Sequence, residues 1–84
     1  SQMSGKIIIV NNSTSPVSAF VSKYNTPNGS DAWYVVPAGE AETWHRNGWE
    51  LVAFKNAADT NRAGVYVQVD KTVIFNTLGH LVVN

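Results

Sequence analysis

Short runs in which apolar and polar residues alternate recur about every ten positions along the 84-residue chain. In residues 17–22, for example, Val17, Ala19 and Val21 alternate with Ser18 and Phe20. A period of two is typical of a β-strand that buries one face, and no segment has the 3.6-residue period of an amphipathic helix. Turn signals rich in asparagine, glycine and proline separate the runs, so the pattern predicts an all-β chain.

Seven or eight short strands are expected, with almost no helix. Residues 65–70 and 72–75 are predicted to form an antiparallel hairpin that turns at Asp70-Lys71. Residues 25–30 and 56–63 are predicted to be loops. The expected strands are residues 6–10, 17–22, 33–36, 41–44, 49–55, 65–70, 72–75 and 80–83.

One-sided strands must bury their apolar faces against a second layer. The expected fold is therefore a small antiparallel β-sandwich, immunoglobulin-like in outline, with a single domain over residues 1–84. Residues 7–10 are apolar on both faces, which predicts a strand either central in the core or covered by a second subunit. Since exposed strand edges offer a further contact, the expected oligomer is a homodimer.

Composition and charge narrow the possible partners. Hydrophobic residues make up 44% of the chain, enough for a core, and the absence of cysteine excludes disulfides and thiolate metal sites. Six basic and six acidic residues form no run of one sign, unlike the basic surface of most nucleic-acid binders. No apolar run approaches the length of a membrane span. We expect neither a nucleic-acid partner nor membrane insertion.

The N-terminus lacks a basic region followed by a secretory hydrophobic segment, which favours a cytoplasmic location. The start at Ser1 also fits removal of an initiator methionine. A signal peptide already cleaved from a precursor would leave the same sequence, so that alternative stays open.

The stretch between Asp31 and Glu50 holds all three tryptophans and a mixture of polar groups. An indole ring packs on the apolar face of a pyranose, while carboxylate, amide, guanidinium and imidazole groups bond its hydroxyls in directional pairs. This mixture predicts a shallow carbohydrate-binding site. The candidate ligand-binding residues are Asp31, Trp33, Trp44, His45, Arg46, Asn47 and Trp49.

These residues also have structural interpretations. Trp33 and Trp49 lie in strand-like runs, where burial is expected, whereas Trp44 adjoins a polar turn and is the best candidate for exposure. Arg46 is either a ligand contact or the surface partner of a neighbouring glutamate, and His45 is either a contact or a solvated surface group.

No catalytic constellation is recognisable. A carboxylate pair for glycoside hydrolysis can be imagined among Glu40, Glu42 and Glu50, but their setting is expected to be exposed. Two histidines without cysteine give no zinc pattern, and the scattered aspartates lack the spacing of a calcium loop. No enzyme activity, metal or cofactor is expected.

The layout of the chain resembles small cysteine-free β-sandwich proteins of mushroom-forming fungi. The segments that carry the resemblance are Ile-Val-Asn-Asn-Ser within residues 8–13, Trp and Pro-Ala-Gly within 33–39, Thr-Trp-His-Arg at 43–46, and Trp-Glu-Leu-Val at 49–52. Several such fruiting-body proteins are cytosolic lectins, often dimeric, thought to act in defence by binding foreign glycans. The resemblance implies a defence-related fungal lectin, and no binding residue is carried over from it.

Three functions stay open. The first is a lectin with glycans as partners, one shallow site per subunit and stronger binding through a dimer. The second is a non-catalytic protein-interaction or structural module that uses the same aromatic patch, because aromatic residues and arginine also dominate protein hot spots. The third is a membrane-active defence protein with aromatic rings at the lipid interface, which the absence of a basic or amphipathic segment disfavours.

Overall fold

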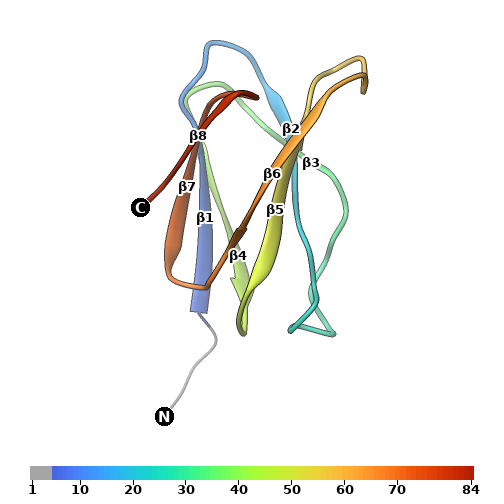
Figure 1. The fold of residues 1–84 in the computed structure, drawn as a ribbon, viewed down its shortest axis with the longest axis vertical. Coiled ribbons are helices and arrows are strands. Elements are labelled where there is room, and N and C mark those ends of the chain that lie inside the picture. Colours follow the sequence, from blue (N-terminus) through green and yellow to red (C-terminus); the bar gives the residue numbers. More distant parts are fainter. Residues whose placement is uncertain (1–4) are drawn as a thin grey trace.

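A computed structural model describes residues 5–84 and arranges eight strands in two sheets (Figure 1). One sheet, sheet A, has the strand order β4-β1-β7-β8, and the other, sheet B, has the order β3-β2-β5-β6. The predicted all-β sandwich is confirmed. The strands are β1 (Gly5–Asn11), β2 (Val17–Val21), β3 (Tyr34–Val36), β4 (Ala41–Arg46), β5 (Glu50–Lys55), β6 (Arg62–Val67), β7 (Lys71–Thr77) and β8 (His80–Val83).

Strand β1 occupies a central position in sheet A. It pairs antiparallel with β4 on one side and parallel with β7 on the other, so the sandwich is mostly rather than wholly antiparallel. Ile7 and Ile9 are fully buried between the sheets, whereas Ile8 and Val10 are partly buried on the outer face of sheet A. The central position predicted from the two-sided apolar pattern is therefore confirmed, and the homodimer stays a prediction.

The core between the sheets consists of aliphatic side chains and two phenylalanine rings. Phe54 of β5 and Phe75 of β7 lie with their centroids 4.9 Å apart and join the two layers. Every second residue of β2 and β5 enters this core, as the alternating pattern predicts. The buried apolar residues are Ile7, Ile9, Val17, Ala19, Val21, Val36, Val52, Phe54, Val67, Val73 and Phe75.

The predicted hairpin of residues 65–70 with 72–75 is wrong. Strand β6 pairs with β5 in sheet B, whereas β7 pairs with β1 and β8 in sheet A, so the chain crosses between the sheets at this turn. Asp70 has a left-handed φ of 70°, and its amide donates to the Lys6 carbonyl oxygen at 2.6 Å. This bond ties the turn to β1. The alternating pattern fixes which face of a strand is buried but does not fix its neighbour.

Most strand boundaries also differ from the prediction, and two of the differences shorten or displace predicted turns. Strand β4 continues through Arg46, and β6 begins at Arg62, which shortens the predicted loop. Asn56 accounts for the compact β5–β6 turn, because its Oδ1 accepts hydrogen bonds from the amides of Thr60 and Asn61 at 2.9 and 3.0 Å. The Asn56 side-chain oxygen takes the place of a backbone acceptor for these two amides, so a short loop is enough to connect the two strands.

Candidate functional site

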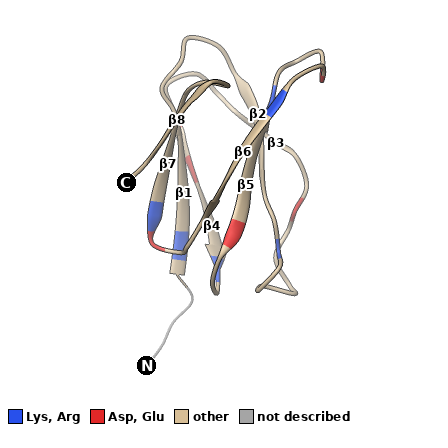
Figure 2. Ribbon diagram, viewed as in Figure 1, with Lys and Arg blue, Asp and Glu red and all other residues tan. Residues whose placement is uncertain are grey.

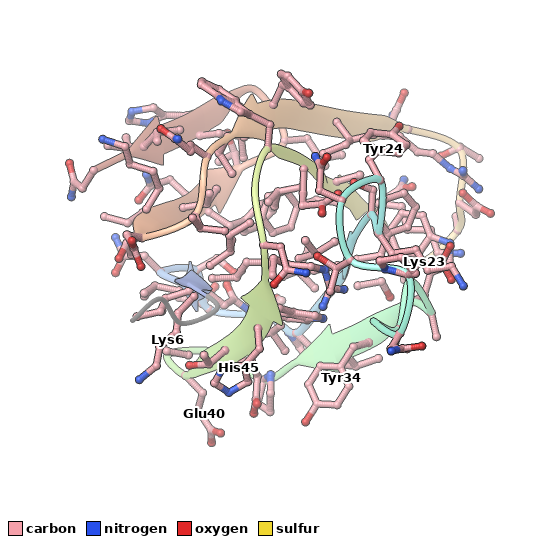
Figure 3. All side chains as sticks on the ribbon, turned by 90° about the horizontal axis from the view of Figure 1, so that it is seen from below. Lys6, Lys23, Tyr24, Tyr34, Glu40 and His45 are labelled. Atoms are coloured by element: carbon pink, nitrogen blue, oxygen red, sulfur yellow. The ribbon has the colours of Figure 1, made fainter. Side chains whose placement is uncertain are left out.

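A cleft of about 260 Å³ opens on the side of the sandwich where β3, an edge of sheet B, faces β4, an edge of sheet A. Figure 3 shows Tyr34 of β3 on the same side of the molecule as Glu40 and His45, which lie before and within β4. The residues that line the cleft are Ser30, Ala32, Trp33, Tyr34, Glu42, Thr43 and Trp44.

The register of β4 explains which of its side chains enter the cleft. Trp44 and Glu42 lie opposite Ile7 and Ile9 of β1, so both project from the inner face of sheet A. Because β4 is an edge strand, its inner face is only partly covered, and Trp44 packs against the core while still lining the opening.

Two aromatic rings and a carboxylate meet in the cleft. The rings of Tyr34 and Trp44 are nearly perpendicular, at 87°, with centroids 6.0 Å apart. The Tyr34 hydroxyl donates a hydrogen bond to Glu42 Oε2 at 3.3 Å, and Tyr34 is 47% exposed. The negative charge of Glu42 is the main cause that raises the pKa of the Tyr34 phenol, with desolvation adding to it. Tyr34 therefore stays a neutral donor beside an ionised acceptor.

Glu50 anchors the loop that leads into the cleft. Its carboxylate is fully buried and accepts four hydrogen bonds from the segment after β2. Oε1 accepts from the Ser22 hydroxyl at 2.8 Å and the Tyr24 amide at 2.7 Å. Oε2 accepts from the Asn25 amide at 3.0 Å and the Thr26 hydroxyl at 3.1 Å. The exposed setting predicted for Glu50 is wrong, because its oxygens replace water as acceptors for this loop.

Arg46 anchors the same loop from β4. It is only 3% exposed, so the predicted surface ion pair with a glutamate is wrong. Burial lowers the pKa of the guanidinium, while the charges of Glu50 and Asp31 act in the opposite direction. The four acceptors of Arg46 are the backbone carbonyl oxygens of Val21, Ser22, Ser30 and His45. Because Ser30 lines the cleft, the bond from Arg46 to Ser30 positions one wall of the cleft.

The three tryptophans do not share one surface. Trp33 and Trp44 line the cleft, whereas Trp49 lies just before β5 and stacks on Tyr66 of β6, with centroids 5.2 Å apart. Trp49 is 45% exposed, and Trp33 and Trp44 are both partly buried. The predicted ranking, with Trp49 buried and Trp44 the most exposed, is therefore wrong.

The remaining predicted residues lie outside the cleft lining. Asp31 is exposed in the loop between two lining residues. His45 points to the outer face of sheet A, because it alternates with Trp44 along β4. Asn47 bonds to the anchored loop: its amide donates to the Thr26 hydroxyl at 3.0 Å, and its side chain donates to the Asn25 carbonyl oxygen at 3.2 Å.

Four lining residues with polar or aromatic side chains were not among the predicted site residues. Tyr34, Glu42, Thr43 and Ser30 all line the cleft. The pattern of β4 carries a signal for one of them, since Glu42 is two residues from Trp44 and so shares its face. Nothing in the sequence identifies Ser30 and Tyr34, because they meet Trp44 only through the packing of one sheet edge against the other.

The charge within the cleft lining itself is acidic. Figure 2 shows basic and acidic residues spread over the molecule without a large patch of one sign. Among the lining residues, Glu42 is the one that is charged at neutral pH, and none is basic. Glu40, just before β4, adds negative charge close enough to raise the pKa of the Tyr34 phenol further.

Comparisons of the chain with protein-family models, curated proteins and solved structures found no match. Within residues 5–84, no helix is long and apolar enough to cross a membrane. The same residues contain no group of three or more histidine, aspartate or glutamate side chains placed to hold a metal ion. The geometry and chemistry of the cleft are thus the basis for a functional proposal.

Proposed function

We propose that this chain is a carbohydrate-binding protein that holds one sugar ring in the β3–β4 cleft. One observation carries the proposal: the perpendicular rings of Tyr34 and Trp44 stand beside the Glu42 carboxylate. An aromatic face packs on the C–H side of a pyranose, and a carboxylate accepts hydrogen bonds from its hydroxyls. The volume of about 260 Å³ lies just below the range of roughly 300–1,000 Å³ typical of drug-sized ligands, which suits a single ring.

The polar groups around the rings have complementary roles. The hydroxyl of Ser30 can donate and accept, so it matches a sugar hydroxyl in either orientation. The Tyr34 phenol donates its proton to Glu42, so its oxygen supplies a further acceptor. Arg46 and Glu50 contribute indirectly, because they hold the loop that carries Ser30. This rigid support reduces the entropy lost when a ligand binds.

The proposed function includes no reaction. Glycoside hydrolysis uses two carboxylates that flank the scissile bond, and Glu42 is the one carboxylate that lines the cleft. A single shallow site binds weakly, so we also propose that a homodimer displays two sites and gains strength from both. In this proposal the protein is a cytoplasmic, defence-related fungal lectin whose partners are glycans.

A glycan array probed with the labelled protein, at a concentration high enough to populate a dimer, tests the proposed function. We expect selective binding to a class of terminal sugar and competition by the same free sugar. A blank array from protein that unfolds cooperatively would contradict the proposal.

A second candidate function is a non-catalytic protein-interaction module. The observation that favours it is the stacked pair of Trp49 and Tyr66, which are 45% and 57% exposed on the outer face of sheet B. Exposed aromatic residues are enriched at the centre of protein interfaces. This function predicts that Trp49→Ala abolishes recovery of a specific protein partner in a pull-down. Unchanged recovery would contradict it.

A further inference from the structure

We propose that the cleft selects sugars that carry a protonated amine over neutral and acidic sugars, because Tyr34, Trp44 and Glu42 together form a site for an ammonium group. This inference rests on the proposed function, in which a sugar occupies the cleft. It adds the chemical class of the ligand, an amino sugar with an unacetylated amine.

The charge around the cleft supports the preference. Glu42 lines the cleft without a basic residue beside it in the lining, and it accepts a hydrogen bond from the neutral Tyr34 hydroxyl at 3.3 Å. Glu40 lies near Tyr34 as well, as its effect on the phenol pKa shows. A carboxylate or sulfate on a sugar would be repelled by these groups, whereas an ammonium group would neutralise Glu42.

The aromatic rings supply the second part of an ammonium site. A cation is attracted to the face of an aromatic ring within about 6 Å of its centroid, and tryptophan is the strongest partner. Tyr34 and Trp44 present two walls at 87°, so a cation in the corner between them can contact both and still reach the carboxylate. Two rings with an adjacent carboxylate match an ammonium group better than they match a neutral hydroxyl.

Trp33, the other tryptophan that lines the cleft, already has cations beside it. Lys55 Nζ lies 4.4 Å from the Trp33 ring centroid, and Arg62 lies 5.2 Å from it. Both cations are paired with Asp59, which accepts two hydrogen bonds from Arg62 at 2.8 and 2.9 Å and one from Lys55 at 3.5 Å. Asp59 therefore offsets part of their charge, and within residues 5–84 no cation lies over the rings of Tyr34 and Trp44.

Sugar hydroxyls are needed to complete the match. Ser30 lines the cleft alongside the aromatic corner, and a bare alkylammonium ion would leave its hydroxyl without a ligand partner. A sugar ring fills this remaining space and bonds the Ser30 hydroxyl through one of its own. An amino sugar therefore uses both halves of the cleft.

The test is a titration with four methyl glycosides in the gluco and galacto series: the free amine, the N-acetylated amine, the neutral sugar and the uronic acid. Binding is followed by tryptophan fluorescence and by NMR shifts, at a pH where the amine is protonated. We expect the free amine to bind about tenfold more tightly than the neutral sugar and the uronic acid to bind most weakly. Tetramethylammonium serves as a cation without a sugar.

Glu42→Gln is the matched variant, because the amide keeps the size of the side chain and an acceptor for Tyr34. We expect it to remove the preference for the amine, so that the free amine and the neutral sugar bind the variant with similar affinity. Asp70→Asn, which also removes one negative charge but does not line the cleft, should keep the preference.

The outcomes separate the two proposals. Equal affinity for amine and neutral sugars overturns the amine preference and leaves carbohydrate binding in place. If no sugar binds, carbohydrate binding in the cleft is overturned and the preference with it. Tight binding of tetramethylammonium without any sugar binding also overturns both, since the cleft would then be a simple cation site. The comparison on the unmodified protein is sufficient by itself if Glu42→Gln does not fold.

Discussion

Replacing Glu50 with glutamine tests how the loop beside the cleft is held. The buried carboxylate accepts four hydrogen bonds, two on each oxygen. Glutamine has the same shape but offers one acceptor oxygen and an NH₂ group that can only donate. Whichever way the amide is oriented, two donors of the loop lose their acceptor inside the protein.

The expected cost follows from the number of bonds lost. A hydrogen bond to a charged group contributes about 1.5–3 kcal/mol, so losing two costs about 3–6 kcal/mol. A domain of 84 residues has a free energy of unfolding of about 4–13 kcal/mol at typical values per residue. Glu50→Gln is therefore expected to remove a large part of the stability of the fold.

Urea unfolding followed by circular dichroism measures this loss as a lower transition midpoint. Glu40→Gln is the matched control, because Glu40 is exposed and its change should stay within about 0.5 kcal/mol. Amide hydrogen exchange adds a local readout, in which the amides of Tyr24 and Asn25 lose protection in the Glu50 variant. If Glu50→Gln lies within about 1 kcal/mol of the unmodified protein, the buried carboxylate does not hold the loop and the reasoning is refuted.

The other structural predictions concern one glycine and one aspartate. Gly29→Ala is expected to cost about 1–3 kcal/mol in urea unfolding, because the added Cβ would lie 2.9 Å from Arg46 Nη1. Gly79→Ala, whose Cβ would meet nothing nearer than 4.0 Å, should change the midpoint little, and equal effects would contradict the clash. Hydrogen bonds from Arg62 lower the pKa of Asp59 from 3.8, so its contribution to stability is present above that value and is lost as the pH falls through the lowered pKa. An NMR titration should show this low pKa and its return toward 3.8 in Arg62→Ala, and an unshifted carboxyl in the unmodified protein would contradict the contact.

The local alternation of apolar and polar residues predicts most of the strands and their buried faces. It does not predict which strands pair with each other. The alternation around Val17, Ala19 and Val21 identifies a strand and its buried face, and the two-sided residues 7–10 identify a central strand. The sheet that receives residues 71–77 depends on contacts with β1, which is more than sixty positions away in the sequence. Local alternation contains no information about such a partner.

The candidate site shows the same limit. The mixture of aromatic and polar residues predicts a site in the segment with Trp33 and Trp44, and both tryptophans line the cleft. The charge of a residue did not predict its exposure. Arg46 and Glu50 are both buried, and each is hydrogen-bonded to a loop more than twenty positions earlier in the sequence. Polar residues in a core need partners, and these partners become visible only when the loop is folded. Trp49 is exposed for a related reason, since it alternates with the buried Glu50.

Glycan binding by two tyrosine variants tests most directly whether the cleft is the binding site. Tyr34→Ala removes one wall of the cleft, and Tyr66→Ala removes an exposed ring of the same type from the outer face of sheet B. Both variants should unfold cooperatively, because neither ring belongs to the core. On the same glycan array, we expect Tyr34→Ala to lose binding and Tyr66→Ala to retain it. Retained binding by Tyr34→Ala, or loss only in Tyr66→Ala, would contradict the assignment of the sugar to the β3–β4 cleft.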